Sequence, residues 1–127
     1  MPYNSCEELS RDLCNFTYDM LNNLDMEKEV NVRVFYSRLY YALFHKILDA
    51  LGYDKYSNVA KLHEKIRDIL FQHMNENNTY RMFYQTFIEL KDLRVWADYK
   101  VKNSIPNTNY KYYQYKVYKL IHQNLSL

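Results

Sequence analysis

Turn-forming residues are scarce in this sequence, which contains one glycine and two prolines among 127 residues. Sheets and hairpins use far more glycine and proline at their turns, so this composition favours an all-helical fold. A chain of this length forms one domain that can bury a core without disulfides or a structural metal. We therefore expect residues 1–127 to form a single all-α domain, a bundle of about five helices.

Cysteines and long apolar runs are also scarce. Cys6 and Cys14 fall on one predicted helix two turns apart, and a spacing of about 12 Å is too long for a disulfide between them. We expect both to be reduced thiols in a cytoplasmic protein. The opening residues do not have a signal-peptide pattern, and the longest apolar run, Leu39 to Phe44, is far too short to cross a membrane.

Acidic residues are absent after Asp98. The chain before Tyr99 carries 12 basic and 15 acidic side chains, a net charge of −3, whereas the remainder carries +5. The five lysines of this last segment are Lys100, Lys102, Lys111, Lys116 and Lys119. Such a basic segment suits a polyanionic partner, although a solvated lysine face is the commoner explanation.

The most apolar stretch runs from Arg33 to Gly52. On a helical wheel its apolar side chains fill well over half of the circumference, whereas a surface helix has an apolar stripe only about 100° wide. We expect this helix to be central, beginning between Met26 and Asn31 and ending at Gly52. Ser37 lies inside its apolar arc, where the hydroxyl can bond to a carbonyl one turn earlier. The predicted polar strip comprises Arg38, Ala42, His45, Lys46 and Asp49.

Four further helices are predicted from apolar residues at three- and four-residue spacing. Ser5 and Glu8 form a capping box at the start of the first helix, and an asparagine or threonine of residues 77–79 caps the fourth. The predicted ranges are 5 to 22–25, 58–74 after a loop over 53–57, 80–101 and 110–125. The predicted buried stripe of the first helix comprises Leu9, Leu13, Phe16, Met20 and Leu24.

Arg94 interrupts the apolar stripe predicted for the fourth helix, and Asp98 is one turn further on. The rest of that stripe comprises Phe83, Phe87, Leu90, Ala97 and Val101, with Trp96 and Tyr99 pointing elsewhere. A guanidinium in an apolar stripe must be paired, or must border a cavity or an interface. One interpretation is an Arg94–Asp98 pair, which has the weaker base-before-acid order. The other is an anion site at a subunit interface, because arginine binds carboxylates and phosphates bidentately.

The histidines allow two interpretations. Arg38, His45 and Asp49 could form a phosphate-binding group in which the carboxylate holds the histidine in one tautomer. An exposed helix face with an incidental pair is the alternative, and we favour it. His63 and His73 are ten residues apart on the third helix with no further ligand at metal spacing, so we expect no metal site and two histidines at the edge of the core.

The outer side of the fifth helix interleaves aromatic and basic residues. These are Lys111, Tyr112, Tyr115, Lys116, Lys119 and His122. Aromatic rings can stack on bases while lysines hold the phosphate backbone. With 15 tyrosines in the chain, some exposed tyrosine is expected in any case.

Two segments resemble motifs of the HEPN domain family: SRLYYALFH at 37–45 and LRVWADY at 93–99. The resemblance covers nearly the whole chain, including a helix that begins near His63. It implies an up-and-down helical bundle that usually dimerises. It also implies work on RNA or nucleotides in prokaryotic conflict systems, including toxin–antitoxin modules with a small nucleotidyltransferase partner and CRISPR-linked effectors.

Active members of that family carry arginine, four to six intervening residues, and histidine. Arg94 matches the arginine, but Tyr99, Lys100 and Val101 occupy the positions where histidine could stand. Histidine titrates near neutral pH, whereas tyrosine has an ordinary pKa of about 10. The resemblance therefore implies either a metal-independent endoribonuclease or a non-catalytic nucleotide- or protein-binding module that regulates a nucleotidyltransferase-like partner.

The candidate catalytic residues are accordingly Arg94, Asp98, Tyr99 and His45, of which His45 titrates near neutral pH. The candidate RNA- or nucleotide-binding residues are Arg38, Lys100, Lys102, Lys116 and Lys119. We expect a homodimer, or a complex with a nucleotidyltransferase-like antitoxin. We expect no cofactor, no metal and no association with a membrane.

Overall fold

A computed structural model describes residues 3–52 and 59–125, which form five helices and no strand. The helices are α1 (Cys6–Asn23), α2 (Glu29–Ala50), α3 (Val59–His73), α4 (Asn78–Tyr99) and α5 (Tyr110–Ile121). The predicted all-helical bundle of about five helices is confirmed. The predicted loop over 53–57 and the predicted helix start at Asn58 lie outside the described residues.

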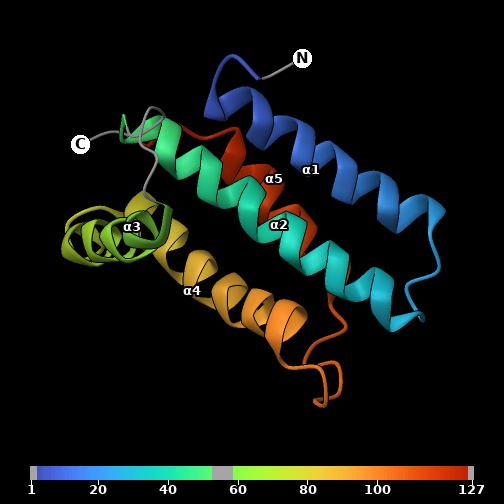
Figure 1. The fold of residues 1–127 in the computed structure, drawn as a ribbon. Helices are drawn as coiled ribbons and strands as arrows, with labels where there is room; N and C mark the ends of the chain where they lie inside the picture. Colours follow the sequence, from blue (N-terminus) through green and yellow to red (C-terminus); the bar gives the residue numbers. More distant parts are fainter. Residues whose placement is uncertain (1–2, 53–58, 126–127) are drawn as a thin grey trace.

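The arrangement of the helices places α2 at the centre. In Figure 1, α2 lies between α1 and α4 with α5 behind it, and α2 contacts all four other helices. The fully buried side chains of α2 include Phe35, Tyr36, Leu39, Leu43 and Ile47. Burying a side chain of this size contributes roughly 1.5–3 kcal/mol, so α2 supplies much of the stability of the core.

Three of the predicted helix ends have the expected caps. Ser5 Oγ accepts a hydrogen bond from the Glu8 amide at 3.2 Å, while the Glu8 carboxylate accepts from the Asn4 amide and not from that of Ser5. Asn77 Oδ1 accepts from the amides of residues 79 and 80 at the start of α4. Gly52, which follows α2, has φ +79°, a conformation that glycine adopts without strain.

The buried face of α1 differs from the predicted stripe by about one residue. Ser10, Cys14, Thr17 and Met20 are buried, whereas Phe16 and Leu24 are exposed. The small side chains let α1 lie close to α2, and their hydroxyls are satisfied by backbone carbonyls. The Ser10 hydroxyl donates to the carbonyl of Ala42 at 2.6 Å.

The polar strip of α2 is narrower than predicted. Ala42 and Lys46 are buried, and the Ala42 carbonyl is the acceptor for the Ser10 hydroxyl of α1.

On α4, Trp96 is buried although it was predicted to point away from the core, and Val101 is 74% exposed although it was predicted to face inward. Val101 lies beyond the end of α4 at Tyr99, so the helical periodicity no longer places it.

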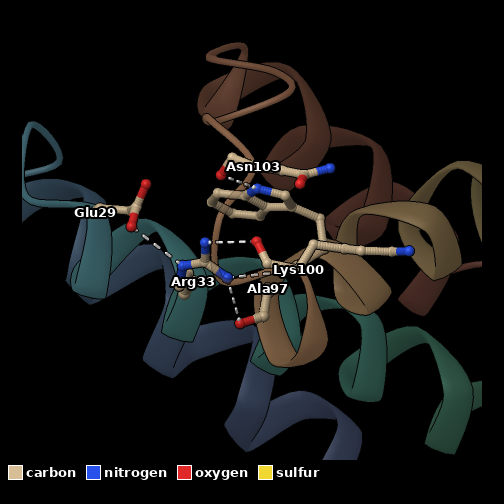
Figure 2. Close-up of polar contacts among 6 residues, drawn as sticks. Glu29, Arg33, Ala97, Lys100 and Asn103 are labelled. Atoms are coloured by element: carbon tan, nitrogen blue, oxygen red, sulfur yellow. Dashed lines mark hydrogen bonds and ion pairs between the residues drawn. The ribbon is translucent and has the colours of Figure 1, made fainter.

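The carboxyl end of α4 is held by Arg33 of α2 (Figure 2). Arg33 Nη1 donates to the carbonyls of Trp96 at 2.7 Å and Ala97 at 3.2 Å, and Nη2 donates to that of Lys100 at 3.0 Å. The Arg33 guanidinium lies 4.3 Å from the centre of the Trp96 ring, and its Nε contacts Glu29. The Trp96 carbonyl also accepts from the Lys100 amide, and the Lys100 carbonyl accepts from the Asn103 amide. Arg33 adds charged hydrogen bonds to this end, where a cation favours the negative end of the helix dipole.

We expect Arg33→Ala to lower the free energy of unfolding by roughly 1.5–3 kcal/mol, because charged hydrogen bonds to the end of α4 are lost. Arg33→Lys should recover little, since an ammonium cannot reproduce the fork that spans three carbonyls. Urea unfolding measures both effects. Arg67→Ala is the control, because the contact of Arg67 is an ion pair with Asp68 at the surface. Equal stabilities of the Arg33 and Arg67 variants would contradict the capping role.

Candidate functional site

Arg94 lies on the side of α4 that faces α2, and its side chain is 14% exposed. Three tyrosine rings surround its guanidinium carbon: the ring centroids of Tyr40, Tyr41 and Tyr99 are 5.2, 5.9 and 5.8 Å away. A guanidinium at such distances is attracted to the aromatic faces, more strongly where water is excluded. Tyr99, which is exposed, extends the cluster to the surface.

Asp98 is the acidic neighbour of Arg94, but the pair is loose. Arg94 Nη1 lies 3.7 Å from Asp98 Oδ2, beyond hydrogen-bond distance. The Ser37 hydroxyl donates to the same oxygen at 3.5 Å, in place of the predicted bond to its own helix. Arg94 Nε is buried and has no hydrogen-bond acceptor among the described residues. A buried donor without a partner costs free energy, so this guanidinium is suited to donate to a further anion.

His63 of α3 belongs to the same cluster, although it is not among the predicted site residues. Its Nδ1 shares a hydrogen bond with the Tyr40 hydroxyl, and its ring stacks on Tyr40 and on Phe44, with centroids 5.5 and 4.1 Å apart. Burial, and then the charge of Arg94, lower the pKa of His63 to about 4. Burial raises the pKa of Tyr40, so both groups are uncharged at neutral pH.

His45 lies next to this cluster on α2. The centroid of its ring is 6.2 Å from that of Tyr41 and 5.4 Å from that of Phe44, and its charge acts on His63. Among the candidate catalytic residues, the structure therefore groups Arg94, Asp98 and Tyr99 closely. It places His45 beside the rings of Tyr41 and Phe44, which are part of the same aromatic cluster.

Arg38 and two of the candidate lysines lie on α2 and just after α4, the elements that carry most of the Arg94 group. Arg38 is exposed and lines, with Ser37 and Asp98, a hollow of about 200 Å³ between α2 and α4. Lys100 and Lys102 are exposed just after α4, where the carbonyl of Lys100 is held by Arg33. These basic side chains can widen a positive surface around Arg94.

Lys116 and Lys119 do not join the Arg94 group. They lie on α5, where they line a separate hollow of about 200 Å³ between α4 and α5. Lys116 Nζ lies 4.9 Å from the Tyr112 ring centre, and Lys119 Nζ lies 5.4 Å from that of Tyr115. The structure therefore divides the predicted binding residues between two faces.

Neither a metal site nor a membrane-spanning helix is found in residues 3–52 and 59–125. No three histidine, cysteine, aspartate or glutamate side chains in this part of the chain are grouped as ligands of a metal ion. None of the described helices is long and apolar enough to cross a membrane. Comparison with protein-family models, curated proteins and solved structures found no match to this chain.

Proposed function

We propose that this chain is an RNA-binding protein of the HEPN type that holds an RNA phosphate at Arg94. The observation that carries the proposal is the nearly buried guanidinium, which has only a loose ion pair with Asp98 and a buried Nε without an acceptor. Phosphate oxygens match the planar donors of arginine, and a charge-assisted hydrogen bond gains strength where water is excluded.

The neighbours of Arg94 have complementary roles in this proposal. Asp98, held by Ser37, orients the guanidinium. Tyr99 presents an exposed ring on which a base can stack. Arg38, Lys100 and Lys102 supply further positive charge to the RNA backbone. The resemblance of residues 37–45 and 93–99 to HEPN motifs supports RNA as the ligand, in a prokaryotic conflict system with a nucleotidyltransferase-like partner.

Binding without cleavage is favoured by the state of His63. A histidine with a pKa of about 4 is a weak base at neutral pH and is too rarely protonated to act as an acid. Cleavage is the second candidate, because Tyr40 links His63 to Arg94. The Tyr40 hydroxyl is hydrogen-bonded to His63, and the Tyr40 ring lies 5.2 Å from the Arg94 guanidinium carbon. A bound phosphate would oppose the charge of Arg94 and raise the pKa of His63 toward neutrality.

The test is to incubate the wild-type protein with a mixed RNA pool in the presence of a chelator. Fluorescence anisotropy reports binding and a denaturing gel reports the integrity of the RNA. We expect the protein to bind the RNA and to leave it intact. If the wild type produces RNA fragments and the His63→Gln variant does not, the protein cleaves RNA as well as binding it. An absence of RNA binding would contradict both functions.

We also propose that two copies of the chain associate through the surface beside Arg94. Exposed apolar side chains support this: Val30 and Val34 of α2 line the hollow next to Asp98, and Val101 lies just beyond the end of α4. Exposed apolar side chains that lie together are typical of interfaces. A two-fold axis there would bring two Arg94 groups near each other.

We expect Val34→Glu to convert the dimer to a monomer at the concentration at which the wild type is dimeric, because a charge would be buried in the interface. Sedimentation velocity measures this. Phe71→Glu, which changes an exposed ring on α3, is the control. A monomeric wild type, or a dimer that survives Val34→Glu, would contradict this assembly.

A further inference from the structure

Exposed tyrosines gather on α5 and on the neighbouring face of α1. Tyr112, Tyr115 and Tyr118 of α5 are half exposed or more, as is Tyr18 of α1. We call this surface, together with its lysines, the tyrosine–lysine face. Its members are Tyr18, Lys111, Tyr112, Tyr115, Lys116, Tyr118 and Lys119.

Two grooves run along this face, one on each side of α5. The α1–α5 groove has a volume of about 520 Å³ and is lined by Tyr18, Lys111, Tyr115 and Tyr118 among others. The α4–α5 hollow is the one that contains Lys116 and Lys119. Tyr115 lines both, so its ring forms a ridge between them. A cavity of several hundred Å³ is large enough for a small ligand such as a nucleotide.

The floor of the α1–α5 groove contains a polar side chain with an unused acceptor. Gln114 is buried, and its Nε2 donates to the Cys14 carbonyl at 3.0 Å. Gln114 Oε1 is buried and has no hydrogen-bond donor among the described residues. The amino group of a nucleobase inserted above Gln114 could supply the donor that is missing.

The charges on this face favour a polyanion. Lys111 lines the α1–α5 groove, and Lys116 and Lys119 lie against tyrosine rings in the α4–α5 hollow. Among residues 3–52 and 59–125, those that line the two grooves include no aspartate or glutamate. Glu89 of α4 is the carboxylate whose charge acts on Lys116, so the α4–α5 side is less positive than the lysines alone would make it.

We propose that the tyrosine–lysine face binds single-stranded RNA, with bases stacked on Tyr115 and its neighbours and with phosphates held by the lysines. Aromatic platforms among basic side chains bind single strands in this way, because every base has a face that can stack. The proposal extends the proposed function, because RNA is the ligand in both. It assigns RNA contacts to a face that shares no residue with the Arg94 group.

The experiment is a titration of a short fluorescein-labelled poly(U) strand with the full chain, followed by anisotropy. Tyr115→Ala is expected to weaken binding roughly 5- to 100-fold, because one base loses its stacking partner. Tyr115→Phe should bind as the wild type does, since phenylalanine retains the stacking face. Lys119→Gln should flatten the dependence of log K on log salt by about 0.7, whereas Tyr115→Ala should leave that slope unchanged.

Phe71→Ala is the matched control, because it removes an exposed aromatic ring from α3. Circular dichroism verifies that each variant is folded. Unchanged binding by Tyr115→Ala, an equal loss in Phe71→Ala, or a loss in Tyr115→Phe equal to that of the alanine variant would each overturn the proposal. Equal competition by duplex RNA or by poly-glutamate would also overturn it, since neither offers free bases to stack.

The same titration with Arg94→Ala separates this inference from the proposed function. A loss with Arg94→Ala and none with Tyr115→Ala would support the Arg94 site and overturn the tyrosine–lysine face. The reverse result would support the tyrosine–lysine face and count against the Arg94 site. A loss with both variants supports both sites.

Discussion

Arg94→Ala is expected to weaken RNA binding roughly 10- to 150-fold, because a charge-assisted, bidentate contact with phosphate is lost. The effect on folding should be modest, because the 3.7 Å pair with Asp98 contributes little and removal of a partly buried cation relieves a desolvation cost. This relief offsets the loss of the contacts with the three tyrosine rings. Arg94→Lys should recover little of the affinity, because an ammonium cannot reproduce the planar fork. Anisotropy measures the affinity and thermal unfolding measures the stability.

Arg81→Ala is the matched control for this variant, because Arg81 is an exposed arginine of the same helix. It should change affinity far less than Arg94→Ala does. If Arg94→Ala binds RNA as the wild type does and its melting temperature falls clearly, then Arg94 serves the fold and the RNA-binding proposal must be abandoned.

Leu43→Lys is expected to abolish folding, because it places an ammonium in the middle of the core. Leu43 is 0% exposed and lies on the central helix. An unpaired buried charge costs several kcal/mol, and the loss of packing adds to it, against a typical total stability of about 5–15 kcal/mol. The variant should lose its cooperative thermal transition and accumulate in the insoluble fraction, as measured by circular dichroism and sedimentation.

Leu24→Lys is the control, and it also tests the register of α1. The apolar pattern predicts a buried Leu24, whereas the structure places it at the surface after α1. Its replacement should therefore change stability by less than about 0.5 kcal/mol. A soluble, cooperatively folded Leu43→Lys variant would contradict the central position of α2.

The helices could be predicted because local signals mark them. The wide apolar arc of α2 can be satisfied only by a central position, and Ser5, Asn77 and Gly52 supply the caps at helix ends. The face of α1 could not be predicted from hydrophobicity. Ser10 is buried because its hydroxyl donates to a carbonyl of α2. The spacing of apolar residues cannot predict such a contact.

The candidate site could be predicted only as far as one helix extends. Arg94 and Asp98 are one turn apart, so the spacing alone brings them together. The contact between Tyr40 and His63 joins α2 to α3, and periodicity shows which face of a helix is apolar but not which helix it meets. The contacts of Arg33 with the end of α4, more than sixty residues away in the sequence, could not be predicted for the same reason.

The central claim is that the Arg94 guanidinium holds an RNA phosphate, and NMR of arginine side chains tests it most directly. Because Arg94 Nε is buried, its N–H should be protected from exchange with water and give an observable signal. That signal, assigned by its loss in Arg94→Lys, is followed while RNA is added to the wild type. We predict a large, saturable shift of the Arg94 signal. Saturation of the protein with RNA while the Arg94 signal stays unmoved would contradict the account.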